Sequence, residues 1–281
     1  MTRPDLVPPT AASAMAVAPV EGATRRRFGG GRAGGRLLSV GVIVVVLVVW
    51  WVLTTGTGVV KPLYFPAPES LWAALTILNS QLVVDAGATL ARVLASWFGG
   101  SSLGVLVGLL MARTRWVMYA LTPLIEAVRP VPPVALIPFV ILWFGIGDDG
   151  KVFLGALACF MVMVVNTTVA VTNVPPVYLQ AARSLGASTS RVYRSVVFPA
   201  IVPEILSGFR IGSALAFAVI VAAEFLGAEA GIGRLIMQAS RTLNTPVVLL
   251  GTIVIAIMAV LLDVTISRLS AYVTRWSSNR A

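Results

Sequence analysis

The chain contains no histidine and only one cysteine, Cys159. Without histidine, the commonest general base and metal ligand is missing, and a Ser-His catalytic triad is excluded. A single cysteine forms no intrachain disulfide and cannot build a thiolate metal site by itself. We therefore expect no catalytic residue, no metal site and no cofactor.

Charged residues are also scarce. They make up 11% of the chain, where a soluble domain has roughly a quarter. Hydrophobic residues make up 58%, and the mean hydropathy is +0.92. This composition indicates an integral membrane protein in contact with membrane lipid.

The net charge of +10 raises the possibility of nucleic-acid binding, but the positions of the charges argue against it. Residues 1–36 are rich in Pro, Ala, Gly and Arg, and Arg25, Arg26 and Arg27 precede the first apolar run. Such a segment has too little apolar surface to fold alone, so we predict a disordered, basic N-terminal segment. The apolar run that follows, about 37–53, is longer than the core of a secretory signal, which favours a retained anchor.

Six apolar stretches are candidates for membrane spans, since a spanning helix needs about 20 apolar residues. They lie near 37–54, 88–112, 117–145, 151–173, 203–226 and 247–268. The stretch 117–145 contains five prolines, which remove backbone donors, so we predict a break between 117–129 and 133–145. The expected fold is an all-α integral membrane protein with six transmembrane helices.

The distribution of arginine and lysine predicts the orientation. With the N-terminus inside, the connections on the cytoplasmic side hold 14 basic residues and the outer connections hold 4. Because basic residues concentrate in cytoplasmic loops, both termini are predicted to be cytoplasmic. The polar segment around 174–202 would then face the cytoplasm too.

That polar segment has an unusual pattern of small residues. Gln180-Ala181-Ala182 is followed by Gly186 and then by Val196-Val197-Phe198-Pro199. The spacing predicts a short helix, a tight turn and a second short helix. Glycine permits the turn, and small residues let another protein approach the backbone closely.

This pattern resembles the EAA loop of ATP-binding-cassette (ABC) importer permeases, with Gln180 in place of the usual glutamate. Residues 61–276 resemble permeases of the nitrate/sulfonate/taurine branch, closest to taurine permeases. The segments that carry the likeness include Tyr64–Pro68, Arg129–Pro133, Leu142–Gly147 and Pro203–Gly212. The resemblance implies a permease domain over 61–276 with a coupling loop at about 174–202. Before this domain we expect a first transmembrane helix and the start of an external loop at 37–60, and after it a cytoplasmic tail at 277–281. The loop residues that would dock the ATPase are Gln180, Ala181, Ala182, Gly186, Val196 and Pro199.

The resemblance also implies the partners and the mechanism. It implies a type I importer in a bacterial inner membrane, with two cytoplasmic ABC ATPase subunits, an extracytoplasmic substrate-binding protein and a second permease copy. Alternating access driven by ATP on the ATPase subunits would carry a small anion inward, with taurine or another alkanesulfonate first. The chain itself would not be an enzyme.

Polar and charged residues inside the spans are candidates for the translocation path, because charge in hydrocarbon is costly. Arg210 and Glu224 are 14 residues apart, so we expect them on one helix face that looks into the bundle. Arg129 and Asn166 complete the candidate path. A structural role is an equal alternative for these residues, and Glu126 is close enough to pair with Arg129.

Three other interpretations have less support from the sequence. Gly145–Lys151 has most of a phosphate-binding loop, but Val152 stands where Ser or Thr would hold magnesium, so we expect only a polar turn. The alternative function is an ion-gradient-driven secondary carrier, which lacks support because no inverted repeat and no paired acidic site is apparent. A membrane-embedded enzyme would need a nucleophile motif that the sequence does not offer.

Overall fold

The structure is a computed structural model that describes residues 32–58 and 60–275. The chain divides into two compact units, with the boundary between Val49 and Trp50. The first unit contributes most of α1 (Arg32–Trp51), whose side chains from Leu38 to Val49 are exposed. The second unit begins with the last two residues of α1 and a π-helical turn at Val52–Gly56.

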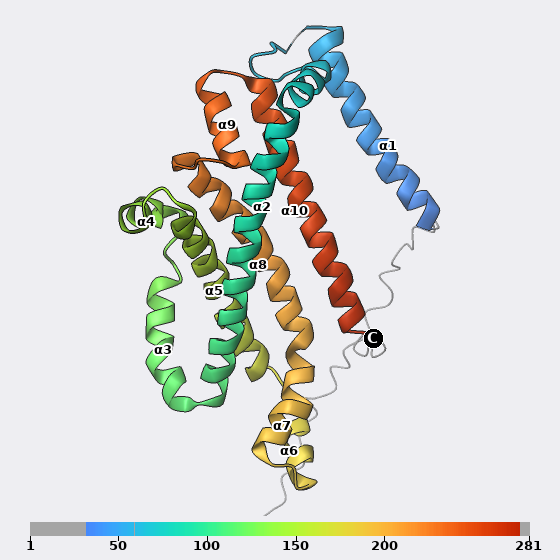
Figure 1. Ribbon diagram of the computed structural model, residues 1–281. Helices are drawn as coiled ribbons and strands as arrows, with labels where there is room; N and C mark the ends of the chain where they lie inside the picture. The colour runs from blue at the N-terminus through green and yellow to red at the C-terminus, as the bar shows by residue number, and fades with distance from the viewer. Residues whose placement is uncertain (1–31, 59, 276–281) are drawn as a thin grey trace, which may run out of the picture. The chain divides into compact units, whose positions relative to one another are not determined.

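The second unit is a bundle of helices, and no strand occurs in the described ranges 32–58 and 60–275. Its helices are α2 (Pro68–Arg113), α3 (Arg115–Val128), α4 (Ile137–Phe144), α5 (Asp148–Thr172), α6 (Pro176–Ser184), α7 (Thr189–Val192), α8 (Phe198–Leu226), α9 (Ile232–Arg241) and α10 (Thr245–Val273). Figure 1 shows α6 and α7 at one end of this bundle and α9 at the other end.

Within the described residues, five helical segments are long and apolar enough to cross a membrane. The pair formed by α3 and the segment Pro133–Phe144 makes a sixth if it is counted as one bent span, with an angle of 82°. The predicted break in this span is confirmed. Pro130, Pro132 and Pro133 lie at the bend, where their missing N–H groups cannot continue a helix.

Two sequence predictions need correction. The basic N-terminal segment was expected to be disordered through residue 36, but α1 begins at Arg32, directly before the apolar run that it continues. Residues 1–31 and the predicted tail 277–281 lie outside the described residues. The predicted span 88–112 is only the second half of α2, which has 46 residues and a length of about 70 Å at 1.5 Å per residue.

The centre of the bundle is a close contact between α2 and α5. Gly100, Gly104 and Gly108 of α2 lie directly against the backbone of α5. A Cβ at Gly104 would come 2.6 Å from the Cβ of Met163, and one at Gly108 would come 2.9 Å from the carbonyl oxygen of Val164. Because no side chain fits between the helices here, the glycine repeat is a packing device, as small residues at four-residue spacing commonly are in membranes.

The half of α2 that was not predicted as a span packs against α9 and α10. Ala74 and Leu82 of α2 are buried with Leu235 of α9 and with Val247 and Leu250 of α10. This cluster holds α9, which is amphipathic, on the end of the bundle. We did not predict α9 from the sequence, because the helix has only ten residues and its apolar residues lie on one face.

Candidate functional site: the coupling loop, an apolar pocket and a buried ion network

The predicted helix–turn–helix at 174–202 is present as α6, a turn and α7. At the C-terminus of α6, the Ala187 N–H donates to the carbonyl oxygen of Ala182 at 3.1 Å, and the Gly186 N–H donates to that of Arg183 at 2.9 Å. These two bonds form a Schellman motif at the end of the helix. In this motif the residue after the C-cap, here Gly186, has a left-handed backbone conformation. Gly186 has φ +76°, so the turn requires glycine here for the reason predicted from the sequence.

The turn projects outward from the bundle, and its tip is apolar. Leu185 is 89% exposed, and Val177 and Tyr178 on α6 are also exposed. An exposed leucine at a loop tip places apolar surface in contact with water, so this surface is suited to a protein partner. An ideal Cβ at Gly186 would have no neighbour within 4 Å in this chain, which leaves the turn open to an approaching surface.

The loop is fixed to the bundle by its other face. Val192 and Val197 are buried with Val174 at the end of α5 and with Ile201 in α8, and Ala182 packs against this cluster. The loop therefore forms one rigid piece with the adjoining ends of α5 and α8, since buried apolar contacts join all three elements.

A hollow of about 740 Å³ lies between the loop and the adjoining ends of α5 and α8. Four of the six predicted docking residues line it: Ala181, Ala182, Val196 and Pro199. Gln180 and Gly186 lie outside it and are exposed. The structure thus brings most of the predicted set together on one concave surface.

The predicted path residues fall in three separate places. Arg129 and Asn166 both line an apolar pocket of about 470 Å³ between the bend after α3, α5 and Leu215 of α8. The Asn166 side-chain amide donates to the carbonyl oxygen of Glu204 at 2.9 Å. The suggested ion pair between Glu126 and Arg129 is absent from the described structure, and both side chains are exposed.

Arg210 lies elsewhere, paired with Asp263 of α10. Its Nε and Nη2 atoms donate to the two carboxylate oxygens at 2.8 Å each, a bidentate ion pair between α8 and α10. The expectation that Arg210 and Glu224 both face the bundle interior is wrong for Arg210, whose side chain is 45% exposed in this chain. The ion pair was not predicted because Asp263 is 53 residues away from Arg210 in the sequence.

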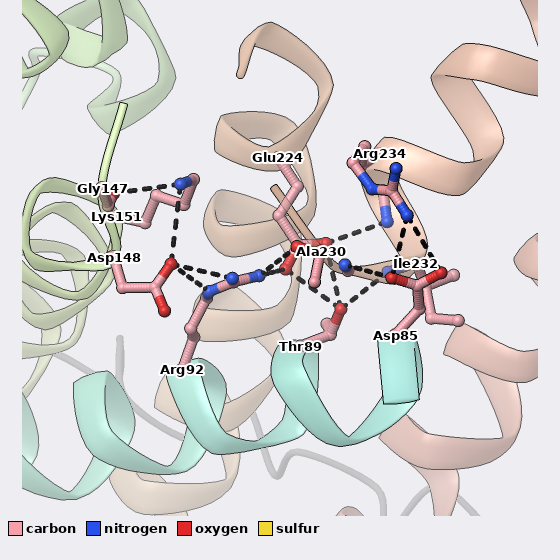
Figure 2. A network of polar contacts seen from close by, with 12 residues as sticks. Asp85, Thr89, Arg92, Gly147, Asp148, Lys151, Glu224, Ala230, Ile232 and Arg234 are labelled. Carbon is pink, nitrogen blue, oxygen red and sulfur yellow. Dashed lines mark hydrogen bonds and ion pairs between the residues drawn. The ribbon is translucent and has the colours of Figure 1, made fainter. Parts of the chain in front are cut away.

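Glu224 is the centre of a buried polar network at the end of the bundle where α5 begins and α8 ends (Figure 2). It is 1% exposed. Its carboxylate accepts hydrogen bonds from the Thr89 hydroxyl at 3.0 Å, from Arg92 Nη1 at 2.6 Å and from the Gly233 N–H at 2.9 Å. Glu224 is thus a fully bonded carboxylate inside the protein.

Arg92 joins Glu224 to two further elements. It donates to the carbonyl oxygen of Ala230 at 2.7 Å, and it also contacts Asp148, the first residue of α5, at 2.8 Å. Asp148 is the exposed member of the network, with a side-chain exposure of 62%. The pair of carboxylates around Arg92 is therefore unequal, with one buried and one at the surface.

Three side chains from other helices cap the N-terminus of α9. Asp85 accepts from the Gly231 N–H at 2.7 Å, the Thr89 hydroxyl accepts from the Ile232 N–H at 2.9 Å, and Glu224 accepts from the Gly233 N–H. The first N–H groups of a helix have no partner within the helix, and carboxylates there are stabilising. No Cβ fits at Gly231 or Gly233 without meeting Glu224.

The sequence analysis did not select Asp85, Thr89 or Arg92 as candidate site residues. Their spacing was a usable signal, because residues four and three apart share one face of a helix. Three polar residues on one face of a membrane helix indicate a buried partner.

The phosphate-loop look-alike at Gly145–Lys151 falls at the elbow between α4 and α5. Lys151 donates to the carbonyl oxygens of Ile146 and Gly147 and lies 3.7 Å from Asp148. A phosphate loop presents N–H groups to its ligand, whereas here lysine binds the carbonyls of its own loop. The segment is a polar turn, as predicted.

The described fold is a helical membrane bundle with one broken span and an exposed helical loop at one end. Residues 100–278 match the family described as binding-protein-dependent transport system inner membrane component. The chain belongs to this family: it is an ABC importer permease of the taurine/sulfonate branch, a transport subunit and not an enzyme, which works with separate ATPase subunits.

Individual relatives agree with this assignment. The chain is 39% identical over 225 residues to the taurine transport system permease protein TauC of Escherichia coli (strain K12), covering 78% of this chain and 82% of TauC. It is 33% identical over 227 residues to the putative aliphatic sulfonates transport permease protein SsuC of the same organism, covering 80% and 86%. The fold is similar to a chain of the MetNI methionine ABC transporter in an inward-facing conformation, with a TM-score of 0.57 and 21% identity over 70% of this chain and 97% of that chain.

Proposed function

We propose that this chain moves taurine or another alkanesulfonate inward across a bacterial inner membrane by alternating access. The observation that carries the proposal is the α6–α7 loop, which is rigidly anchored on one face and exposes Leu185 on the other. Such a loop can receive movement from a docked ATPase and pass it to α5 and α8. The solute is inferred from the names of TauC and SsuC.

The proposed complex contains two copies of this permease, two cytoplasmic ATPase subunits and an extracytoplasmic binding protein. The loop would face the cytoplasm, together with both termini, as the distribution of arginines predicts. Gln180, Ala181, Ala182, Gly186, Val196 and Pro199 would form the docking surface.

The proposed path runs through the apolar pocket that contains Arg129 and Asn166. An anion in hydrocarbon needs a compensating positive charge. Arg129 lines the pocket and has no ion-pair partner among the described residues, so its charge is available to the anion. Arg210 and Glu224 are less suited to contact the solute, because each already has a close partner of opposite charge.

The docking proposal is tested at Gly186 with two variants. Gly186→Ala adds only backbone strain, about 1–2 kcal/mol for a left-handed non-glycine residue, because its Cβ meets nothing in this chain. Gly186→Glu adds the same strain and also a charged side chain on the docking surface. We expect the Glu variant to co-purify poorly with the ATPase subunit, or to lose substrate-stimulated ATP hydrolysis, while the Ala variant is affected far less.

The comparison separates docking from folding. Equal losses in the two variants would show that strain alone matters, and normal stimulated hydrolysis by Gly186→Glu would contradict docking at this turn. Reconstituted vesicles with ATP, the ATPase subunit and the binding protein then test transport directly, with uptake of labelled taurine as the measurement. ATP-independent uptake would favour the secondary carrier.

A further inference from the structure

One residue in the turn between α9 and α10 combines backbone strain with an exposed apolar side chain. Among the described residues other than glycine, only Leu243 has a positive φ, +55°. Leu243 is also 70% exposed. A left-handed conformation is strained for leucine, because its Cβ crowds the backbone, so the residue weakens the turn while packing little against the chain.

The conformation of Leu243 follows from the hydrogen bonds that end α9. The Asn244 N–H donates to the carbonyl oxygen of Ala239 at 2.8 Å, and the Leu243 N–H donates to that of Ser240 at 3.1 Å. These bonds form a second Schellman motif, in which Leu243 has the position that Gly186 has after α6. Glycine or asparagine would make the same turn with less strain. Within this chain, the leucine side chain therefore brings strain with few compensating contacts.

A second exposed loop lies beside this turn. The Thr245 hydroxyl donates to the carbonyl oxygen of Leu63 at 2.7 Å, which joins the turn to the loop before α2. That loop is held by Trp50, whose indole N–H donates to the carbonyl oxygen of Pro66 at 3.1 Å. Leu63 and Tyr64 in this loop are 50% and 74% exposed. The two loops therefore present apolar side chains on a hydrogen-bonded backbone.

Basic residues accompany these apolar side chains. Lys61 and Arg241 are exposed and have no ion pair among the described residues. We call the set Lys61, Leu63, Tyr64, Arg241 and Leu243 the α9–α10 surface. Exposed apolar side chains with charged neighbours are typical of a protein interface, which has an apolar centre and a polar rim.

The position of the α9–α10 surface indicates which partner could reach it. It lies at the end of the bundle opposite the α6–α7 loop (Figure 1). If that loop docks the ATPase, the α9–α10 surface faces the outer side of the membrane, where a binding protein would approach. Lipid is a poorer match, because insertion of Leu243 into hydrocarbon would draw the exposed residues Arg241 and Asn244 with it.

We propose that the α9–α10 surface docks the extracytoplasmic binding protein, with Leu243 inserted into an apolar pocket of that protein and Lys61 and Arg241 facing its carboxylates. The strained turn holds the leucine out from the bundle before the partner arrives, so little conformational freedom is lost on docking. The proposal rests on the proposed function, in which a binding protein delivers the solute.

The test measures docking and stability in the same variants. The full chain is assembled with its ATPase subunits in lipid nanodiscs, and the dissociation constant of the purified, solute-free binding protein is measured. Leu243→Gly and Leu243→Asn both permit the left-handed turn but remove the apolar side chain. We expect each to weaken docking about tenfold or more, because the burial of one leucine is lost, while the thermal midpoint of the chain does not fall. Leu243→Met keeps an apolar side chain of similar size and should stay within about threefold of the parent.

The charged part of the surface is tested with Arg241→Gln, and Arg268→Gln is the matched control. Arg268 is exposed near the other end of α10 and has no ion pair in the described structure. We expect Arg241→Gln to slow association with the binding protein and to reduce its salt dependence, since charges at the rim of an interface act mainly on the association rate. Arg268→Gln should change neither.

The outcomes separate docking from a role in the fold and from lipid contact. Weaker docking together with a lower thermal midpoint in Leu243→Gly and Leu243→Asn would overturn the proposal, because the leucine would then support the fold. Docking equal to that of the parent in both variants would also overturn it and would assign the leucine to lipid contact. If the parent complex itself does not bind the binding protein, the proposed function fails as well, so the two failures are distinguishable.

Discussion

The buried carboxylate of Glu224 offers the sharpest quantitative prediction. Glu224→Gln keeps the shape of the side chain but removes its charge. The carboxylate accepts from Thr89, Arg92 and the Gly233 N–H, all at 3.0 Å or less. The amide group of Gln is a donor, so one of these three donors must face another donor.

The expected cost follows from the partners that remain. Removing one member of a buried ion pair costs about 3–5 kcal/mol when the other is left uncompensated. Arg92 keeps its contact with Asp148, so we expect the lower end, about 3 kcal/mol. At about 2–4 °C per kcal/mol for a chain of this size, the thermal midpoint should fall by about 6–12 °C.

The measurement is thermal unfolding of the full chain in detergent, followed by tryptophan fluorescence. Glu229→Gln is the control, because Glu229 is exposed in the loop between α8 and α9 and has no hydrogen bond in the described structure. Its midpoint should stay within about 1 °C of the parent, since surface changes have small effects. A shift below about 2 °C for Glu224→Gln would refute the network as a stabilising element.

Two further predictions concern orientation and path. With Cys159 replaced by serine, Asp149→Cys should react with an impermeant thiol reagent from outside the cell and Ser188→Cys should not; the opposite pattern would reverse the proposed topology. Arg129→Gln should lower taurine uptake in vesicles while assembly and basal ATP hydrolysis stay intact, because it removes the pocket's cation. Arg210→Gln should instead lower the thermal midpoint, because it breaks the ion pair with Asp263, and uptake that falls only in this second variant would move the path to α8 and α10.

The membrane spans were predictable because hydropathy depends on each segment alone. The break at Pro130–Pro133 and the turn at Gly186 were predictable for a similar reason, since proline and glycine restrict or free the backbone locally. The first half of α2 was missed because Glu69, Gln81 and Asp85 dilute its apolar character, and only α9 and α10 bury its other face.

The candidate sites also differ in how far they could be predicted, because one depends on neighbouring residues and the other on distant ones. The α6–α7 loop follows from a short local pattern, so its helix–turn–helix was predicted in the right place. The ion network depends on pairings across 56 residues, as for Arg92 with Asp148, and 132 residues, as for Arg92 with Glu224. No local pattern specifies such pairs. The spacing of Asp85, Thr89 and Arg92 could reveal only that one face of α2 needed polar partners.

The two ends of the bundle are connected through the same two helices. The α6–α7 loop joins the end of α5 to the start of α8 and is packed against both. The opposite ends of these helices carry Asp148 and Glu224, the two carboxylates that bind Arg92. With 25 and 29 residues, α5 and α8 reach about 38 and 44 Å from the loop to the network. In the proposed mechanism, a movement that begins at a docked ATPase would therefore be carried along both helices to the two carboxylates that bind Arg92.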